Sequence, residues 1–264
     1  MIKIIKKLYC ERIDRLKSDK YRLALYLLYA AFVISVSVYS FSVGMVRNGF
    51  LPLAHAAFFL TALAVAESYL SMRCGKLFLI IVFLVPIGGT LGTCLDLYNV
   101  IPFLDTLLHT ISGFIFCAFG YALMERILVS CGRGSRLASA VFAVAFSLAL
   151  AVVWELFEWG ITMVTKGDML EDSIVTEIHS YFLSGSHNLS VDIPNIEQTL
   201  IIYDGGKTYV IEGGYLDLGG LDTLVDMLVC FLGAVAFGVL CIVDGIKKTE
   251  IVKHITPRCA TKKL

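Results

Sequence analysis

Six long apolar runs dominate this sequence and restrict the chain to a helical fold embedded in a membrane. Each run is long enough to cross the hydrocarbon core of a bilayer as a helix, which takes roughly 20 apolar residues. The runs lie near residues 22–45, 50–71, 77–97, 103–126, 137–161 and 221–245. They are continuous and lack the alternation of a strand in an outer-membrane barrel. We therefore predict an all-α membrane protein, a bundle of six transmembrane helices.

The composition agrees with this prediction. Of the 264 residues, 58% are hydrophobic and 17% are charged, whereas soluble domains are roughly 45–50% apolar and about 25% charged. The formal net charge is zero, but the charges are segregated along the chain. We expect the lipid bilayer as the immediate partner and no nucleic acid.

The basic residues predict the orientation of the helices. Nineteen Lys and Arg residues fall in the segments 1–22, 73–76, 126–136 and 247–263, and three fall on the opposite side. Loops rich in Lys and Arg stay on the cytoplasmic side of a membrane. The basic segments alternate as six spans require, so we predict a multi-pass protein of the cytoplasmic membrane with both termini in the cytoplasm.

This topology divides the chain into five parts. The parts are a basic cytoplasmic segment at 1–21, helices one to five within 22–163, an external acidic insert at 164–220, the sixth helix at 221–245 and a basic cytoplasmic tail at 246–264. Apolar and basic residues interleave at the very start, which fits a helix lying on anionic lipid or a flank that sets the topology.

The external insert is predicted to be an α/β segment that contains a β-hairpin. Residues 199–212 form two β-rich runs around Asp204-Gly205-Gly206, a pattern typical of a hairpin. Residues 168–183 are mildly amphipathic, and we expect a helix there. An insert of this size could form a lid over an external site.

Three of the predicted helices each carry a spaced pair of acidic or His side chains. The pairs are Asp105 with His109, Glu155 with Glu158, and Asp222 with Asp226. Spacings of three or four residues put both members of a pair on one helix face. The topology puts all three pairs at the outer end of the helices. Because ionisable groups at membrane depth are costly and mark functional sites, we predict one outward-facing polar site.

A structural role is the alternative for each pair. Asp105 and Asp222 stand at helix starts, where a carboxylate can cap the helix. Trp154 and Trp159 flank the glutamates and indicate headgroup depth, where a carboxylate costs little. His55, at the outer end of the second run, either joins the site or is an interfacial residue. Near the opposite ends, Glu67 and Glu125 are expected to reach the interface or to pair with Arg73 and Arg126.

The residue types narrow the chemistry. Carboxylates gathered this closely cannot all stay ionised without a counter-charge, and the external side has few Lys or Arg residues to supply it. A divalent metal (Zn, Mn or Fe) fits a set of Asp, Glu and His ligands, and protons are the rival neutraliser. The residues predicted to act as metal ligands or as the catalytic general base are Asp105, His109, Glu155, Glu158, Asp222 and Asp226. The sequence lacks the H-E-x-x-H, G-x-S-x-G and phosphate-loop motifs.

Three segments resemble a known family. LYNVIPFLDTLLHTISGF at 97–114, WELFEW at 154–159 and GYLDLGGLDTLVDMLVCFLGA at 214–234 resemble the YjdF-like family of bacterial integral membrane proteins, whose function is not established. The recurring polar pattern of that family matches the three pairs. The resemblance covers most of helices three to six and implies a fold and a place in the membrane rather than an activity.

A weaker similarity is to VanZ-like proteins, which are linked with glycopeptide resistance at the cell envelope. Their pattern is Asp-x-x-x-His, then Glu-x-x-Gln, then Asp-x-x-x-Asn-x-x-Gly. This sequence departs from the pattern at Glu158 and Asp226, where acids replace amides. The two acids add charge, which favours a cation site.

The sequence leaves three functions open. The first is a metal-dependent hydrolase or transferase that acts on a lipid-linked or envelope substrate. The second is a proton- or cation-coupled transporter that uses the same carboxylates as a relay. Transporters are commonly built from repeats with broken helices, and six spans without such repeats make this function less attractive. The third is a non-catalytic membrane scaffold whose site is a structural cation clip.

Overall fold

Six helices that are long and apolar enough to cross a membrane make up most of the structure, which is a computed structural model describing residues 19–259 except 69, 71, 132 and 133. The long helices are α2 (Lys20–Ser42), α3 (Val46–Ser68), α4 (Lys76–Cys94), α6 (Leu104–Ser130), α7 (Arg136–Thr165) and α9 (Gly220–Lys247). Each coincides with one predicted apolar run, so the predicted six-helix fold is confirmed. The segment at the very start, for which a surface helix or a topology-setting flank was expected, lies outside the described residues.

The described chain forms two compact units. The first unit contains the residues up to Ala151 and those from Leu228 onward, and the second contains residues 152–227. The division falls within α7 and within α9, and each of these helices continues through it without a break.

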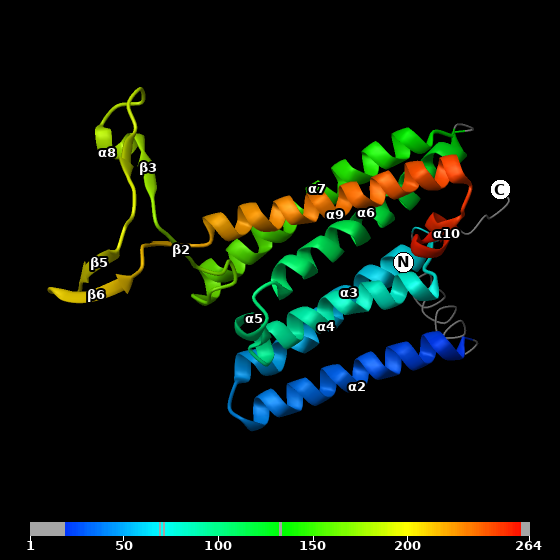
Figure 1. The fold of residues 1–264 in the computed structure, drawn as a ribbon. Helices are drawn as coiled ribbons and strands as arrows, with labels where there is room; N and C mark the ends of the chain where they lie inside the picture. The colour runs from blue at the N-terminus through cyan, green and yellow to red at the C-terminus, as the bar shows by residue number, and fades with distance from the viewer. Residues whose placement is uncertain (1–18, 69, 71, 132–133, 260–264) are drawn as a thin grey trace. The chain divides into compact units, whose positions relative to one another are not determined.

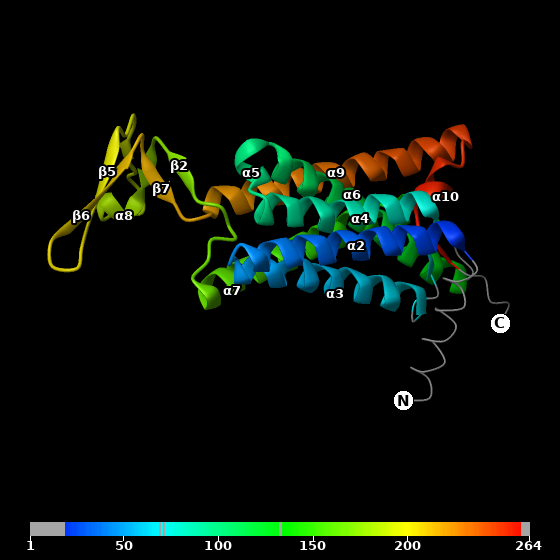
Figure 2. The same ribbon diagram turned by 90° about the horizontal axis from the view of Figure 1, so that it is seen from below.

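In the first unit, α2, α3 and α4 run side by side (Figures 1 and 2), with α6 next to α4. Aromatic rings fill the space between the helices. The ring of Phe83 lies 4.7 Å from that of Tyr29 and 5.3 Å from that of Tyr26, measured between centroids. Many apolar side chains face outward, among them Leu28 and Val38. Such exposure is costly in water and favourable in lipid, as expected for membrane helices.

Two glycines bring α6 and the first-unit part of α9 into backbone contact. A Cβ added at Gly113 would overlap the carbonyl oxygen of Cys230, and one added at Gly233 would overlap the carbonyl oxygen of Thr110. Ser147 on α7 donates its hydroxyl hydrogen to the carbonyl oxygen of Gly113 over 2.9 Å. Small residues allow membrane helices to approach this closely. The contacts fix how α6, α7 and α9 lie along one another at this level.

A buried ion pair lies at the opposite end of the first unit. Nη1 of Arg22 lies 2.7 Å from Oε1 of Glu67, and Nη2 donates to the carbonyl oxygen of Cys74 over 2.6 Å. The expected pairing of Glu67 with Arg73 is therefore wrong, because a residue distant in sequence occupies the position. Glu125 accepts a hydrogen bond of 2.6 Å from the Ser139 hydroxyl, a contact between α6 and α7 that the sequence did not predict.

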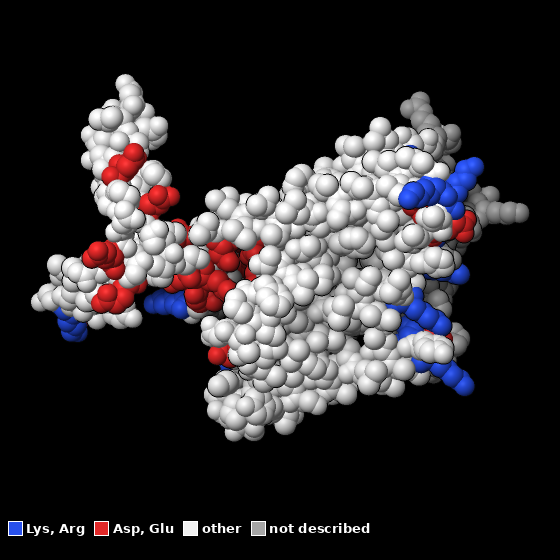
Figure 3. All heavy atoms as spheres, viewed as in Figure 1, with Lys and Arg blue, Asp and Glu red and all other residues white. Residues whose placement is uncertain are grey.

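The tail folds back against this same end. The short helix α10 (Ile251–Ile255) follows α9, and strand β8 (Arg258–Cys259) pairs antiparallel with β1 (Met72–Arg73). Figure 3 shows Lys and Arg side chains of the first unit gathered at the end that carries α10. This gathering is the pattern from which the orientation was predicted.

The second unit carries three antiparallel strand pairs. They are β2 (Ser173–Val175) with β7 (Tyr215–Asp217), β3 (Ile178–Ser180) with β4 (Val191–Ile193), and β5 (Gln198–Tyr203) with β6 (Lys207–Glu212). The last pair is the predicted hairpin. Its turn has Asp204, Gly205 and Gly206 at φ 42°, 75° and 103°, a left-handed conformation that glycine adopts without strain.

The helix expected at 168–183 is wrong. Residues 173–180 contain β2 and β3, and only Tyr181–Ser184 is helical, as the short α8. The segment contains Ile174, Val175 and Ile178, and β-branched side chains favour strands. The partner strands begin at residues 191 and 215, so this pairing has no local signal in the sequence.

We predict that Gly113→Ala destabilises the protein by about 1–3 kcal/mol, because the added methyl group would force α6 and α9 apart. Thermal unfolding in detergent measures the change. Gly160→Ala is the control, because a Cβ at Gly160 has no atom within 4 Å among those described. Equal unfolding temperatures for the two variants would contradict the close helix contact.

Candidate functional site

The first pair of predicted site residues lies in the opening turns of α6. Oδ1 of Asp105 is 3.7 Å from Nε2 of His109, as the four-residue spacing predicts. The neighbouring Leu108 packs against Gly88 on α4, so α4 covers the Leu108 side of α6. Asp105 and His109 are only partly exposed.

The other two pairs lie in the second unit. Glu155 and Glu158 occupy the last turns of α7, and Asp222 and Asp226 occupy the first turns of α9. Glu155 is 6% exposed and Asp226 is 3% exposed. Carboxylates are rarely buried to this extent without a compensating partner. Glu158 is half-buried, and Asp222 is too.

The hydrogen bonds at the start of α9 test whether Asp222 caps this helix, which was the structural alternative for that residue. The backbone N–H of Leu221 donates to Oδ2 of Asp217 over 2.6 Å. Asp217, which no sequence argument singled out, therefore accepts from one of the first N–H groups of α9, a role that the structural alternative had given to Asp222.

Acidic and His side chains in the described part of the chain are close enough to one another to hold a metal ion. One group consists of Asp105, His109 and Asp226, and another consists of His109, Glu155 and Glu158. In each group, one ligand atom per residue lies within 4.8 Å of the others. These groups contain five of the six predicted ligands, and Asp222 belongs to neither.

A further polar cluster lies in the first unit around Gly89. Nδ1 of His55 on α3 lies 3.1 Å from the hydroxyl oxygen of Thr90 on α4. The hydroxyl of Tyr98, on the short helix α5 (Leu97–Val100), lies near the same glycine. His55 was a candidate from the sequence, whereas Thr90 and Tyr98 were missed. A single Thr or Tyr has no characteristic spacing in a sequence, so no signal could have found them.

The insert contains an ion pair that is independent of the membrane helices. Nδ1 of His179 lies 2.9 Å from Oδ1 of Asp192, which is its registered partner across β3 and β4, and Nε2 lies 3.7 Å from Oε1 of Glu177. The hydrogen bond to Asp192 is the main cause that raises the pKa of His179, and it also lowers the pKa of Asp192. Both members are charged between these two pKa values.

We predict that NMR of histidine-labelled protein finds the pKa of His179 above the ordinary value near 6.5. A raised pKa in the folded state stabilises β3–β4 pairing at low pH, and this contribution is lost as pH rises through the raised value. Asp192→Asn should return the pKa of His179 toward the ordinary value. Glu212→Gln, on the other hairpin, should leave it unchanged. If His179 had the same pKa in the wild-type protein and in Asp192→Asn, the pairing would be refuted.

Comparison with known proteins gives a family. Residues 21–245 match the family described as "Predicted membrane protein (DUF2238)", a range that includes all three pairs and nearly all of the six long helices. The chain therefore belongs to this family. No curated protein and no solved structure matches the chain.

Proposed function

We propose that this member of the DUF2238 family binds a divalent cation with ligands drawn from Asp105, His109, Glu155, Glu158, Asp222 and Asp226. We further propose that the site serves hydrolysis or group transfer on a lipid-linked or cell-envelope substrate. The observation that carries the proposal is the two groups of ligand atoms that are spaced closely enough to hold a metal ion.

The packing of α6 and α9 supports the convergence of their acidic ends. The two helices cross where Thr110 and Gly113 meet Cys230 and Gly233. A helix advances about 1.5 Å per residue, so one turn is about 5.4 Å. Going back one turn from this crossing on each helix leads to His109 on α6 and to Asp226 on α9. The proposal therefore takes these two residues to lie at one level.

The same reasoning extends to α7, which runs in the opposite direction. Ser147 bonds to the carbonyl oxygen of Gly113, and Glu155 follows eight residues later, about 12 Å further along the axis. The equivalent distance from Gly113 toward the start of α6 leads to Asp105. In the proposed site, the glutamates of α7 would therefore approach the level of the Asp105–His109 pair.

The charge of such a cluster favours a cation. Five of the six side chains are acids, none is Lys or Arg, and Glu155 and Asp226 are buried. Like charges close together and out of water cannot all remain ionised. Carboxylate and imidazole ligands suit zinc, manganese and iron. A proton shared among the carboxylates is the alternative neutraliser.

The residues have distinct expected roles. When bound, a divalent ion supplies a Lewis acid and water of lowered pKa, so the site needs no protein nucleophile. Oδ1 of Asp105 lies 3.7 Å from Nε2 of His109, and this carboxylate would help to orient the ring, as carboxylates commonly do for a ligating His. A glutamate of α7 that is not ligating would be the general base.

The outer end of α7 suits a substrate that resides in lipid. Leu156, Phe157 and Trp159 are exposed on this helix, while Glu155 and Glu158 are more buried. Exposed apolar and Trp side chains are typical of the membrane interface. A lipid-linked molecule could therefore approach the carboxylates from within the bilayer. We propose that this end faces the outside, in accord with the distribution of Lys and Arg.

The middle of the helix pair disfavours a proton relay. Cys117 and Ala118 on α6, and Ala234 and Phe237 on α9, are fully buried. Relays across a membrane use chains of ionisable groups, and these described residues offer none of the acids or histidines that such chains contain. We regard the YjdF-like resemblance as referring to this same family. The similarity to VanZ-like proteins rests on motif spacing alone.

The metal content of the purified protein tests the proposal. After exposure to zinc, manganese and iron, wild-type protein should retain near-stoichiometric metal by mass spectrometry. His109→Ala/Asp226→Ala should lose it, because two ligands of one group are removed. His187→Ala/Asp204→Ala removes the same residue types from the insert and should retain the metal. Glu158→Gln, a milder change, should weaken metal retention by roughly tenfold.

The outcomes separate the three functions. Metal lost from site variants that still unfold cooperatively supports the metal site and justifies a search for substrates. Loss of both metal and cooperative unfolding in every site variant, Glu158→Gln included, indicates a structural cation clip. Wild-type protein without metal contradicts the proposal and favours protons as the neutralising charge.

A further inference from the structure

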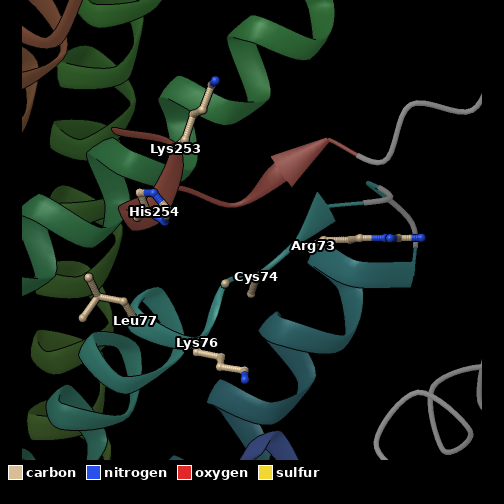
Figure 4. A pocket seen from close by; sticks show the side chains of 7 residues that line it. Arg73, Cys74, Lys76, Leu77, Lys253 and His254 are labelled. Carbon is tan, nitrogen blue, oxygen red and sulfur yellow. The ribbon is translucent and has the colours of Figure 1, made fainter. Parts of the chain in front are cut away.

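A hollow of about 560 Å³ opens in the first unit where α4 begins. Figure 4 shows its two walls, residues 73–77 at the start of α4 and the pair Lys253 and His254 on α10. Arg73, Lys76 and Lys253 are cationic, and no acid is among the described residues that line the hollow. The site lies at the opposite end of α6 and α9 from the proposed metal ligands and does not depend on that proposal.

Hydrogen bonds and core packing hold in place the wall that the tail forms. Oδ1 of Asp244 accepts hydrogen bonds from the Thr249 hydroxyl over 2.7 Å and from the backbone N–H of Ile251 over 2.6 Å. Val252 and Ile255 are buried in the core. The pairing of β8 with β1 closes the segment on the far side. The hollow is therefore held open between two fixed elements.

The cationic side chains lie around the rim of the hollow and do not converge on one point. In Figure 4 the side chains of Arg73, Lys76 and Lys253 extend to different sides. Nζ of Lys76 lies 4.0 Å from the centre of the Tyr21 ring, and Lys253 pairs with Glu250. Such a rim suits a large anionic headgroup better than a small ion held by converging ligands.

Two features point to a phosphate on a lipid. Gly75 precedes α4 in an extended conformation without a side-chain cap, so the first N–H groups of this helix of 19 residues add positive potential. Leu77, Ile80 and Leu84 are exposed on α4, and their spacing puts them on one helix face leading away from the hollow. That face can take hydrocarbon chains.

We propose that the hollow binds the headgroup of an anionic phospholipid, with its acyl chains along Leu77, Ile80 and Leu84. Basic pockets at the ends of membrane helices bind anionic headgroups through the same combination of charge and apolar surface. A lipid held here would bridge α4 and the tail.

Lipid affinity of the full chain tests this inference. Purified protein is titrated with labelled phosphatidylglycerol and with phosphatidylcholine in detergent. Arg73→Gln/Lys76→Gln should weaken phosphatidylglycerol binding roughly thirtyfold, because each cation near a lipid surface contributes about 1 kcal/mol. Lys247→Gln/Lys248→Gln removes equal charge from the nearby end of α9, outside the hollow, and should change the affinity less than about threefold.

Three other results would overturn the proposed lipid site. Equal losses in both double variants would overturn the site, because general surface attraction would explain binding. Equal affinity of wild-type protein for the two lipids would also overturn it. Displacement of phosphatidylglycerol by millimolar inorganic phosphate would reject the lipid and indicate a soluble phosphate ligand.

The variant Ile80→Ser tests the acyl chains separately from the headgroup. It removes apolar surface from the exposed face of α4 and leaves every charge of the rim in place. Binding of phosphatidylglycerol should weaken by about fivefold, because less hydrocarbon is covered. An unchanged affinity would reject the path proposed for the chains.

Discussion

The free-energy cost of placing charge and unpaired backbone groups in hydrocarbon governs this structure. Each long helix bonds its own backbone groups, so its apolar side chains can face lipid without further cost. Charged side chains are confined to the ends of the helices unless a partner accompanies them. The buried Glu67 has Arg22 beside it. By the same rule, burial of the carboxylates of Glu155 and Asp226 carries a free-energy cost that a bound cation would offset, which is the physical basis of the proposed cation site.

In the proposed site, close packing within the first unit would set the level that these carboxylates approach. The glycines at 113 and 233 leave no room for a side chain between α6 and α9, and Ser147 ties α7 to the same point. All three helices continue without a break from this contact toward the predicted site residues. The chemistry proposed at the ends of the helices therefore depends on a steric contact about one to two turns away.

Local patterns in the sequence predicted the parts of the structure that depend on interactions between residues close together in the chain. Apolar length predicted the six long helices, Asp204-Gly205-Gly206 predicted the hairpin, and four-residue spacing predicted the Asp105–His109 pair. Contacts between distant segments could not be predicted. Arg22 takes the place expected for Arg73 beside Glu67, and β2 pairs with a strand about 40 residues later. For the candidate site, the spaced acidic and His residues predicted the ligands that we propose, whereas the Asp217–Leu221 hydrogen bond and the His55–Thr90 contact came only from the structure.

The central claim is that the polar ends of α6 and α9 share one site. Cysteines at the two positions, in the variant His109→Cys/Asp226→Cys, test this most directly through disulfide formation in the membrane. The account predicts rapid cross-linking of this pair. It predicts none for Leu108→Cys/Asp226→Cys, because Leu108 packs on Gly88 of α4. Cross-linking of the second pair but not of the first would contradict the shared site.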